Sequence, residues 1–141
     1  MRAFLLPLAL TIVANVIYHF SQKSVPKTAN PLIVLAGAYI IALAATVALL
    51  IAERSMPTAA SIRTLNWSVI AMGLAIVGVE MGFLLAYRNG LKVSLGAAIS
   101  NVTVALVLLP FGVLFAREQL TVANVVGIAC CIVGLVLIVR P

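Results

Sequence analysis

The chain alternates between long apolar runs and short polar breaks. The runs cover residues 3–20, 31–52, 66–87, 93–115 and 121–139, and each is close to the roughly 20 residues that a helix needs to cross a bilayer core. None of the runs contains lysine or arginine, and Glu80 is their one carboxylate. We therefore predict an all-α integral membrane protein with five transmembrane helices, in a single transmembrane domain over residues 1–141.

Residues typical of helix ends occupy the breaks. Asn30 precedes Pro31, and this pair suits a helix start because Asn caps the first turn and proline is tolerated at its first position. Asn66 closes the next polar stretch, and Asn89-Gly90 predicts a tight turn. No break is long enough to fold on its own, so we predict no second domain.

Composition excludes most other classes of protein. The chain is 65% apolar with a mean hydropathy of +1.27, which places it among membrane proteins. We expect a multi-pass protein of the cytoplasmic (inner) cell membrane. The net charge is +6, but the basic residues are scattered singly, so we expect no nucleic-acid partner. Cys130 and Cys131 are sequence neighbours that point in different directions on a helix, which implies neither a disulfide nor a metal site. No nucleophile–base pair, phosphate loop or zinc motif is present, so we expect no enzyme activity and no cofactor.

The basic residues at the span ends give almost no orientation bias. Four lie on one side of the predicted spans and five on the other: Arg2, Arg54, Arg63 and Arg117 against Lys23, Lys27, Arg88, Lys92 and Arg140. An excess of positive charge normally marks the cytoplasmic side of a membrane protein. A nearly equal division of the basic residues therefore predicts that the chain can insert in both directions. Two opposed copies could then pair about an axis in the membrane plane, the symmetry of inverted-repeat transporters. The alternative is that one arginine fixes a single orientation.

Glu80 is the sharpest candidate for a functional residue. It lies within the third run, seven residues before Tyr87 and therefore about 10 Å below the nearer end. A buried carboxylate is costly at that depth and usually faces a cavity or a partner. It could bind a cationic group or exchange a proton. It could equally hold helices together, for example by pairing with Arg88.

Polar side chains also recur at helical spacing in the first and fourth runs. The first carries Thr11, Asn15, Tyr18 or His19, and Gln22 on one face, and the fourth carries Asn101 near mid-membrane. These side chains could line a substrate path or form hydrogen bonds between helices. We take Glu80, Asn15, Tyr18, His19 and Asn101 as candidates for substrate binding or proton coupling.

The second half of the chain resembles the end of an EamA-type repeat of the drug/metabolite transporter superfamily. The resemblance rests on Tyr87, Gly90 and Leu91 in the turn after the third run, on the bridge over residues 117–121, and on the glycine-rich last run. Members of that superfamily usually have two inverted repeats in ten spans. The resemblance therefore implies one repeat of five spans, a half-size protein completed by antiparallel dimerisation.

The chain is also similar to the small multidrug resistance family, whose members have four spans and form antiparallel dimers. Residues 14–17, read as Ala-Asn-Val-Ile, and Lys23 match a first-helix setting in which that family carries an essential Glu. Asn15 stands in place of that Glu and cannot take up a proton, so drug/proton antiport would need Glu80 as the substitute. Gly127 and Gly134 match the family's glycine spacing in the last helix, which implies a dimer contact.

The combined interpretation is a transporter of small metabolites or amphiphilic, cationic compounds. It would work by alternating access as an antiparallel homodimer, or with a paralogous partner, surrounded by membrane lipid. Two other hypotheses remain open at this point. One is a flippase for a lipid-linked sugar, and the other is a non-transporting accessory subunit of a larger membrane complex.

Overall fold

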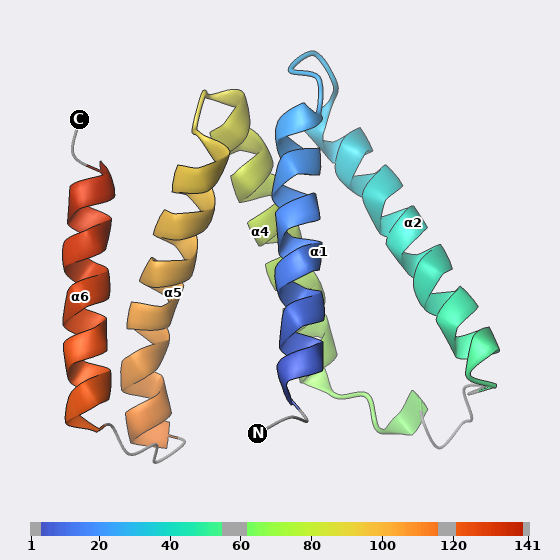
Figure 1. Ribbon diagram of the computed structural model, residues 1–141. Coiled ribbons are helices and arrows are strands. Elements are labelled where there is room, and N and C mark those ends of the chain that lie inside the picture. The colour runs from blue at the N-terminus through green and yellow to red at the C-terminus, as the bar shows by residue number, and fades with distance from the viewer. Residues whose placement is uncertain (1–3, 55–61, 116–120, 140–141) are drawn as a thin grey trace. The chain divides into compact units, whose positions relative to one another are not determined.

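The computed structural model describes residues 4–54, 62–115 and 121–139 (Figure 1). These residues form five long helices, and no strand occurs among them. The helices are α1 (Leu5–Ser24), α2 (Pro31–Ala52), α4 (Trp67–Arg88), α5 (Val93–Phe115) and α6 (Val122–Val139). The predicted all-α class and the five helices are confirmed.

Helix boundaries follow the capping residues expected from the sequence. Helices α2 and α5 begin and end where the apolar runs do. The Asn30 side chain accepts a hydrogen bond from the Leu32 N–H at 2.9 Å, and Asn66 accepts one from the Ser68 N–H at 2.9 Å. Each bond satisfies a backbone donor that the first helical turn leaves unpaired.

The turn between α4 and α5 also has the predicted form. Asn89 ends α4 by donating its backbone N–H to the Leu85 carbonyl at 3.0 Å. Gly90 follows with φ +97°, a left-handed conformation that a residue without a Cβ adopts readily. Helix α5 begins three residues later, at Val93.

Helix α1 is the element whose end differs most from the prediction. The apolar run stops at Phe20, but the helix continues through Gln22 and Lys23 to Ser24. Polar side chains are tolerated in this last turn because both have partners on α4: Gln22 contacts Glu80, and Lys23 donates to the Tyr87 carbonyl. The helix end predicted from hydropathy alone is therefore four residues too early.

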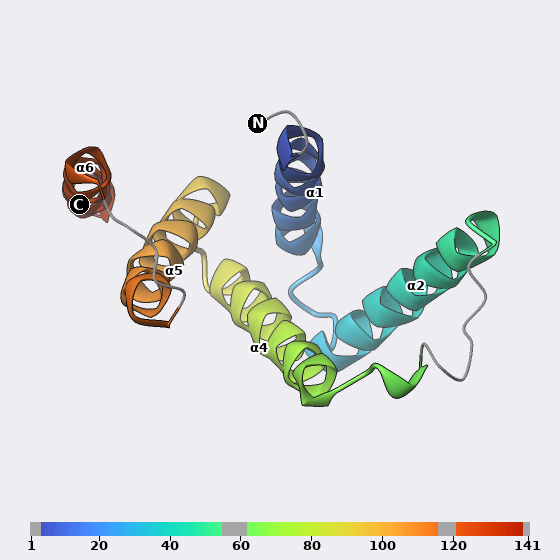
Figure 2. The same cartoon turned by 90° about the horizontal axis from the view of Figure 1, so that it is seen from below.

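Two compact units make up the chain. One consists of Met1–Phe20 with Gly90–Pro141, and within it α5 and α6 lie side by side in both views (Figures 1 and 2). The other is Ser21–Asn89, in which α2 packs against α4 and the last turn of α1 is included. We refer to them below as the split unit and the continuous unit.

The helices present apolar side chains outward along most of their length. Four of them are long and apolar enough to cross a membrane, and a fifth apolar helix over Val122–Ile138 is shorter. In each of those four at most 11% of the apolar window is buried. Such a surface is stable in lipid, where apolar side chains face a solvent as apolar as themselves. The chain is a multi-pass membrane protein.

Burial in the continuous unit concentrates towards the end where α2 begins and α4 finishes. Leu35, Leu84 and Tyr87 are 3%, 0% and 2% exposed, and Gln22 is also buried. This end is the packed part of the continuous unit. The bridge that carries part of the family resemblance, Arg117 to Leu120, lies outside the described residues, as do Arg2 and Arg140 of the charge comparison.

We predict that Leu84→Ala destabilises the protein more than Leu85→Ala. Leu84 is fully buried and its truncation leaves a cavity, whereas its neighbour Leu85 is 43% exposed. The expected loss for Leu84→Ala is about 2 kcal/mol or more, because lost packing contacts are not regained from lipid. Heat unfolding in detergent micelles, followed by circular dichroism, measures it. Equal melting temperatures for the two variants would contradict the packing described.

Candidate functional site

A groove lies between α1 and α5 within the split unit. Its volume is about 550 Å³. It is lined by one face of each helix, with Thr11, Ile12, Asn15, Val16, His19 and Phe20 from α1 and Val93, Ser94, Ala97 and Asn101 from α5. We call this the α1–α5 groove. Its wall mixes amide, hydroxyl and imidazole groups with aliphatic and aromatic surface.

Three of the predicted site residues meet in this groove. Asn15 and His19 lie one helical turn apart on α1, and Asn101 comes from α5, far away in the sequence. Asn15 and Asn101 are exposed, whereas His19 is only 4% exposed. The amides are therefore open to a ligand, and the imidazole forms part of the packed wall.

Tyr18 lies beside the groove rather than in it. It lines a shallower hollow on α1 together with Thr11 and Asn15. Its ring meets the His19 ring edge to face, with the centroids 5.1 Å apart and the planes at 69°. The Thr11 hydroxyl donates to the Pro7 carbonyl at 3.0 Å, so this polar group is satisfied within its own helix.

A second hollow of about 590 Å³ lies between α5 and α6. Asn101 reaches this hollow as well, and Asn124 and Gly127 line it from α6. Asn124 carries no distinctive signal in the sequence, because its position near the start of α6 is typical of a helix-start residue. Asn101 therefore lies between two hollows of the split unit and can serve either.

Glu80 belongs to the continuous unit, where it has a partner from α1. The Gln22 amide nitrogen donates to the Glu80 carboxylate oxygen Oε2 at 2.9 Å and lies 3.4 Å from the Glu80 backbone carbonyl. Glu80 is eight residues before the end of α4, about 12 Å along the helix. A hydrogen-bonded amide lowers the cost of holding a carboxylate at this depth.

Tyr39 of α2 is the third member of this site. Its hydroxyl oxygen is buried and has no hydrogen-bond partner among the described residues. The Glu80 carboxylate acts on it electrostatically, so the two groups are near one another. We call Gln22, Tyr39 and Glu80 the Glu80 cluster. Tyr39 was missed because a single tyrosine in an apolar run carries no periodic signal. Gln22 was assigned to the polar face of the first run, but it was not among the five candidates for substrate binding or proton coupling.

Two cationic residues of the continuous unit, Arg88 and Lys23, are bound to backbone carbonyls. Arg88 Nη2 donates to the Ala29 carbonyl at 2.6 Å and lies 3.5 Å from the Pro26 carbonyl. Lys23 Nζ donates to the Tyr87 carbonyl at 3.2 Å and lies 6.0 Å from the centroid of the Tyr87 ring. Gln22 thus fills the position at the carboxylate that the sequence suggested for Arg88.

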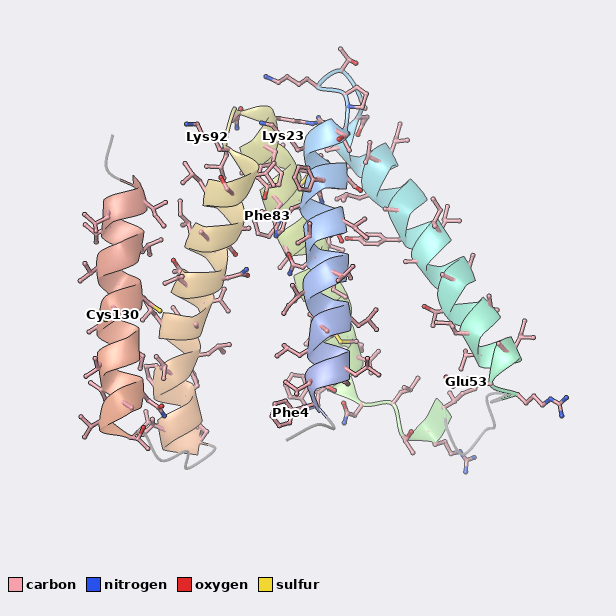
Figure 3. All side chains as sticks on the ribbon, viewed as in Figure 1. Phe4, Lys23, Glu53, Phe83, Lys92 and Cys130 are labelled. Carbon is pink, nitrogen blue, oxygen red and sulfur yellow. The ribbon has the colours of Figure 1, made fainter. Side chains whose placement is uncertain are left out.

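The last two predicted residues, Gly127 and Gly134, leave open space on α6. A Cβ atom added at either position would meet nothing within 4 Å. Cys130 and Cys131, on the same helix, are exposed thiols, and Figure 3 labels Cys130. Within residues 4–54, 62–115 and 121–139, no group of three or more His, Cys, Asp or Glu side chains could hold a metal ion.

Comparison with known protein families gives a match over nearly the whole chain. The family model described as the EamA-like transporter family matches residues 2–140, nearly the whole chain. No curated protein and no solved structure matches.

We predict that Asn101 is accessible to water in the groove. In a background with Cys130→Ala and Cys131→Ala, an Asn101→Cys thiol should react with a maleimide about tenfold faster than an Ile99→Cys thiol. Ile99 is at the same depth on α5 but does not line the groove. Maleimides react with thiolate, which forms in water and not in lipid. Similar rates at the two positions would show that the groove is filled by lipid or protein.

Proposed function

Because the chain belongs to the EamA-like transporter family, we propose that it carries small metabolites or amphiphilic, cationic compounds across the cytoplasmic membrane by alternating access. Membership of the family already makes it a membrane transporter of small molecules. The observation that supports alternating access with these substrates is the α1–α5 groove. It is an open space between two membrane-spanning helices, lined by polar and apolar side chains.

The groove suits an amphiphilic cargo in size and chemistry. A volume of about 550 Å³ falls in the range of roughly 300–1,000 Å³ that small-molecule sites occupy. Its aliphatic and aromatic wall would take an apolar body, and the amides of Asn15 and Asn101 would orient a polar group. Asparagine side chains at membrane depth are costly unless they face a cavity or a partner. A bound substrate would supply hydrogen-bond partners for both asparagine side chains.

Glu80 is the residue that we propose supplies charge or proton coupling. It stands in for the carboxylate that Asn15 cannot provide, and it is the one acidic side chain inside the predicted spans. In the Glu80 cluster, Gln22 orients the carboxylate by a hydrogen bond, and the carboxylate charge interacts electrostatically with the buried Tyr39 hydroxyl. A carboxylate that gains or loses a proton would change its hydrogen bonding to Gln22 and its electrostatic interaction with Tyr39, and this change would bias one conformation over another.

We further propose that the working unit is an antiparallel dimer, made from two copies or from this chain and a paralogue. Two observations support it. The basic residues are divided almost evenly between the two sides of the spans, so either insertion direction is available. Gly127 and Gly134 leave room on α6 for another helix to approach closely.

Glu80→Gln should remove the pH dependence of transport. Glutamine has nearly the shape of the acid and can still accept from Gln22, but it cannot carry a charge or exchange a proton. Uptake of ethidium, a cationic dye, into proteoliposomes with an imposed pH gradient measures the effect. We expect the gradient-driven rate to fall about tenfold or more.

Glu53→Gln is the matched control, because Glu53 caps the far end of α2 and is exposed. Gradient dependence that survives in Glu80→Gln, with both variants inserted and folded, would remove Glu80 from the coupling mechanism. Loss of the dependence in Glu53→Gln as well would point to a general effect of charge.

Tags placed after Pro141 and, separately, beside Arg63 should each be found on both faces of the membrane. Membrane-impermeant labelling of intact cells reads the sidedness of each tag. Comparable amounts on the two faces are expected if one gene product supplies both halves of an antiparallel dimer. A tag confined to one face would exclude the homodimer and direct the search to an oppositely oriented paralogue.

A further inference from the structure

Basic side chains gather at the packed end of the continuous unit. Lys23 lies in the last turn of α1, Lys27 in the connection to α2, and Arg88 at the end of α4. All three positions are at the ends of apolar spans, and this is the level of lipid headgroups for a chain that crosses the bilayer.

Arg88 holds the connection that carries Lys27. Its Nη2 atom contacts the carbonyls of Pro26 and Ala29, which flank Lys27 in the sequence. Lys27 is exposed and extends from this anchored loop. These two hydrogen bonds therefore keep the backbone on either side of Lys27 at the Arg88 guanidinium.

The same guanidinium has an unused donor. Arg88 Nε is buried and has no hydrogen-bond partner in the part of the chain that the structure describes. A buried donor without an acceptor is unfavourable, and a charged one especially so. An anionic oxygen acceptor at this position would satisfy it, and a phosphate can bond Nε and a terminal nitrogen together in the forked geometry typical of arginine.

Among the residues that the structure describes, no acidic side chain is a hydrogen-bond partner of Arg88 or Lys27. The carboxylates among the described residues are Glu53 and Glu80. Glu53 follows the opposite end of α2, as Figure 3 shows, and Glu80 accepts a hydrogen bond from Gln22 about two turns from Arg88. Lys23 is bound to the Tyr87 carbonyl, but its charge adds to the same positive field.

We propose that Arg88 and Lys27 form a binding site for the phosphate of an anionic phospholipid headgroup. Basic pockets at helix ends are where membrane proteins retain such lipids. In this site Arg88 supplies the forked contact through Nε, and Lys27 supplies a point charge from the loop that Arg88 holds. The site is separate from the α1–α5 groove and does not depend on the transport proposal.

The test uses the full chain, purified in mild detergent and incubated with phosphatidylglycerol or phosphatidylcholine. Native mass spectrometry reports the lipid retained per chain in the unmodified protein and in Arg88→Gln, Arg88→Lys and Lys27→Gln. Arg63→Gln is the control, because it removes the same charge from an exposed position before the other end of α4. Circular dichroism checks that each variant is helical.

We expect retention of phosphatidylglycerol over phosphatidylcholine. Its apparent affinity should fall about tenfold in Arg88→Gln, as loss of a charge-assisted hydrogen bond predicts, and by less in Lys27→Gln and Arg88→Lys. Arg63→Gln should behave as the unmodified protein. If Arg88→Gln fails to fold, Lys27→Gln carries the test, since this exposed side chain can change without disturbing the loop.

Three results would overturn the proposal. The first is equal retention of the two lipids. The second is unchanged retention of phosphatidylglycerol in Lys27→Gln and in whichever Arg88 variants fold. The third is displacement of phosphatidylglycerol by inorganic phosphate at equal concentration, which would make this a site for free phosphate instead of lipid.

Discussion

The hydrogen bond from Gln22 to the Glu80 carboxylate is the contact on which the packed end of the continuous unit depends. The hydrocarbon core offers no water, so a carboxylate inside an apolar helix must find its donor on another helix. Gln22 reaches Glu80 only if α1 continues past its apolar run. Once it does, Lys23 lies at the Tyr87 carbonyl, where a cation also meets the negative end of the α4 dipole.

Polar groups in the two units are used differently. In the continuous unit they are tied to one another or to backbone carbonyls, as Gln22, Lys23 and Arg88 show. In the split unit Asn15 and Asn101 are exposed on the walls of a groove. The hydrogen bonds of the continuous unit hold its helices in a fixed position. The exposed amides of the split unit remain available to a ligand that enters the groove. A transporter needs both, because binding must be reversible while the framework around it holds.

Hydropathy predicted the helices well, and helical spacing predicted part of the site. Helices α2 and α5 match their runs because Asn30 and Asn89-Gly90 mark the breaks with capping and turn residues. Asn15 and His19 could be assigned to one face because they are four residues apart. The pairing of Gln22 with Glu80 could not be predicted, since it joins residues 58 positions apart whose meeting depends on how helices pack. Tyr39 could not be predicted either, because a single tyrosine in an apolar run has no periodic signal. The dimer contact at Gly127 and Gly134 stays a prediction.

The division of the chain into units has a consequence for how it is made. Residues 21–89 are contiguous, so all their mutual contacts, including Gln22 with Glu80 and Arg88 with Ala29, can form before α5 leaves the ribosome. The split unit joins the beginning of the chain to its end and cannot be complete until α6 has been synthesised. During biosynthesis, therefore, α1 is inserted in the bilayer before α5, which forms the other wall of the groove, has been synthesised. A chain truncated after Asn89 would contain every residue of the Glu80 cluster but only the α1 wall of the α1–α5 groove.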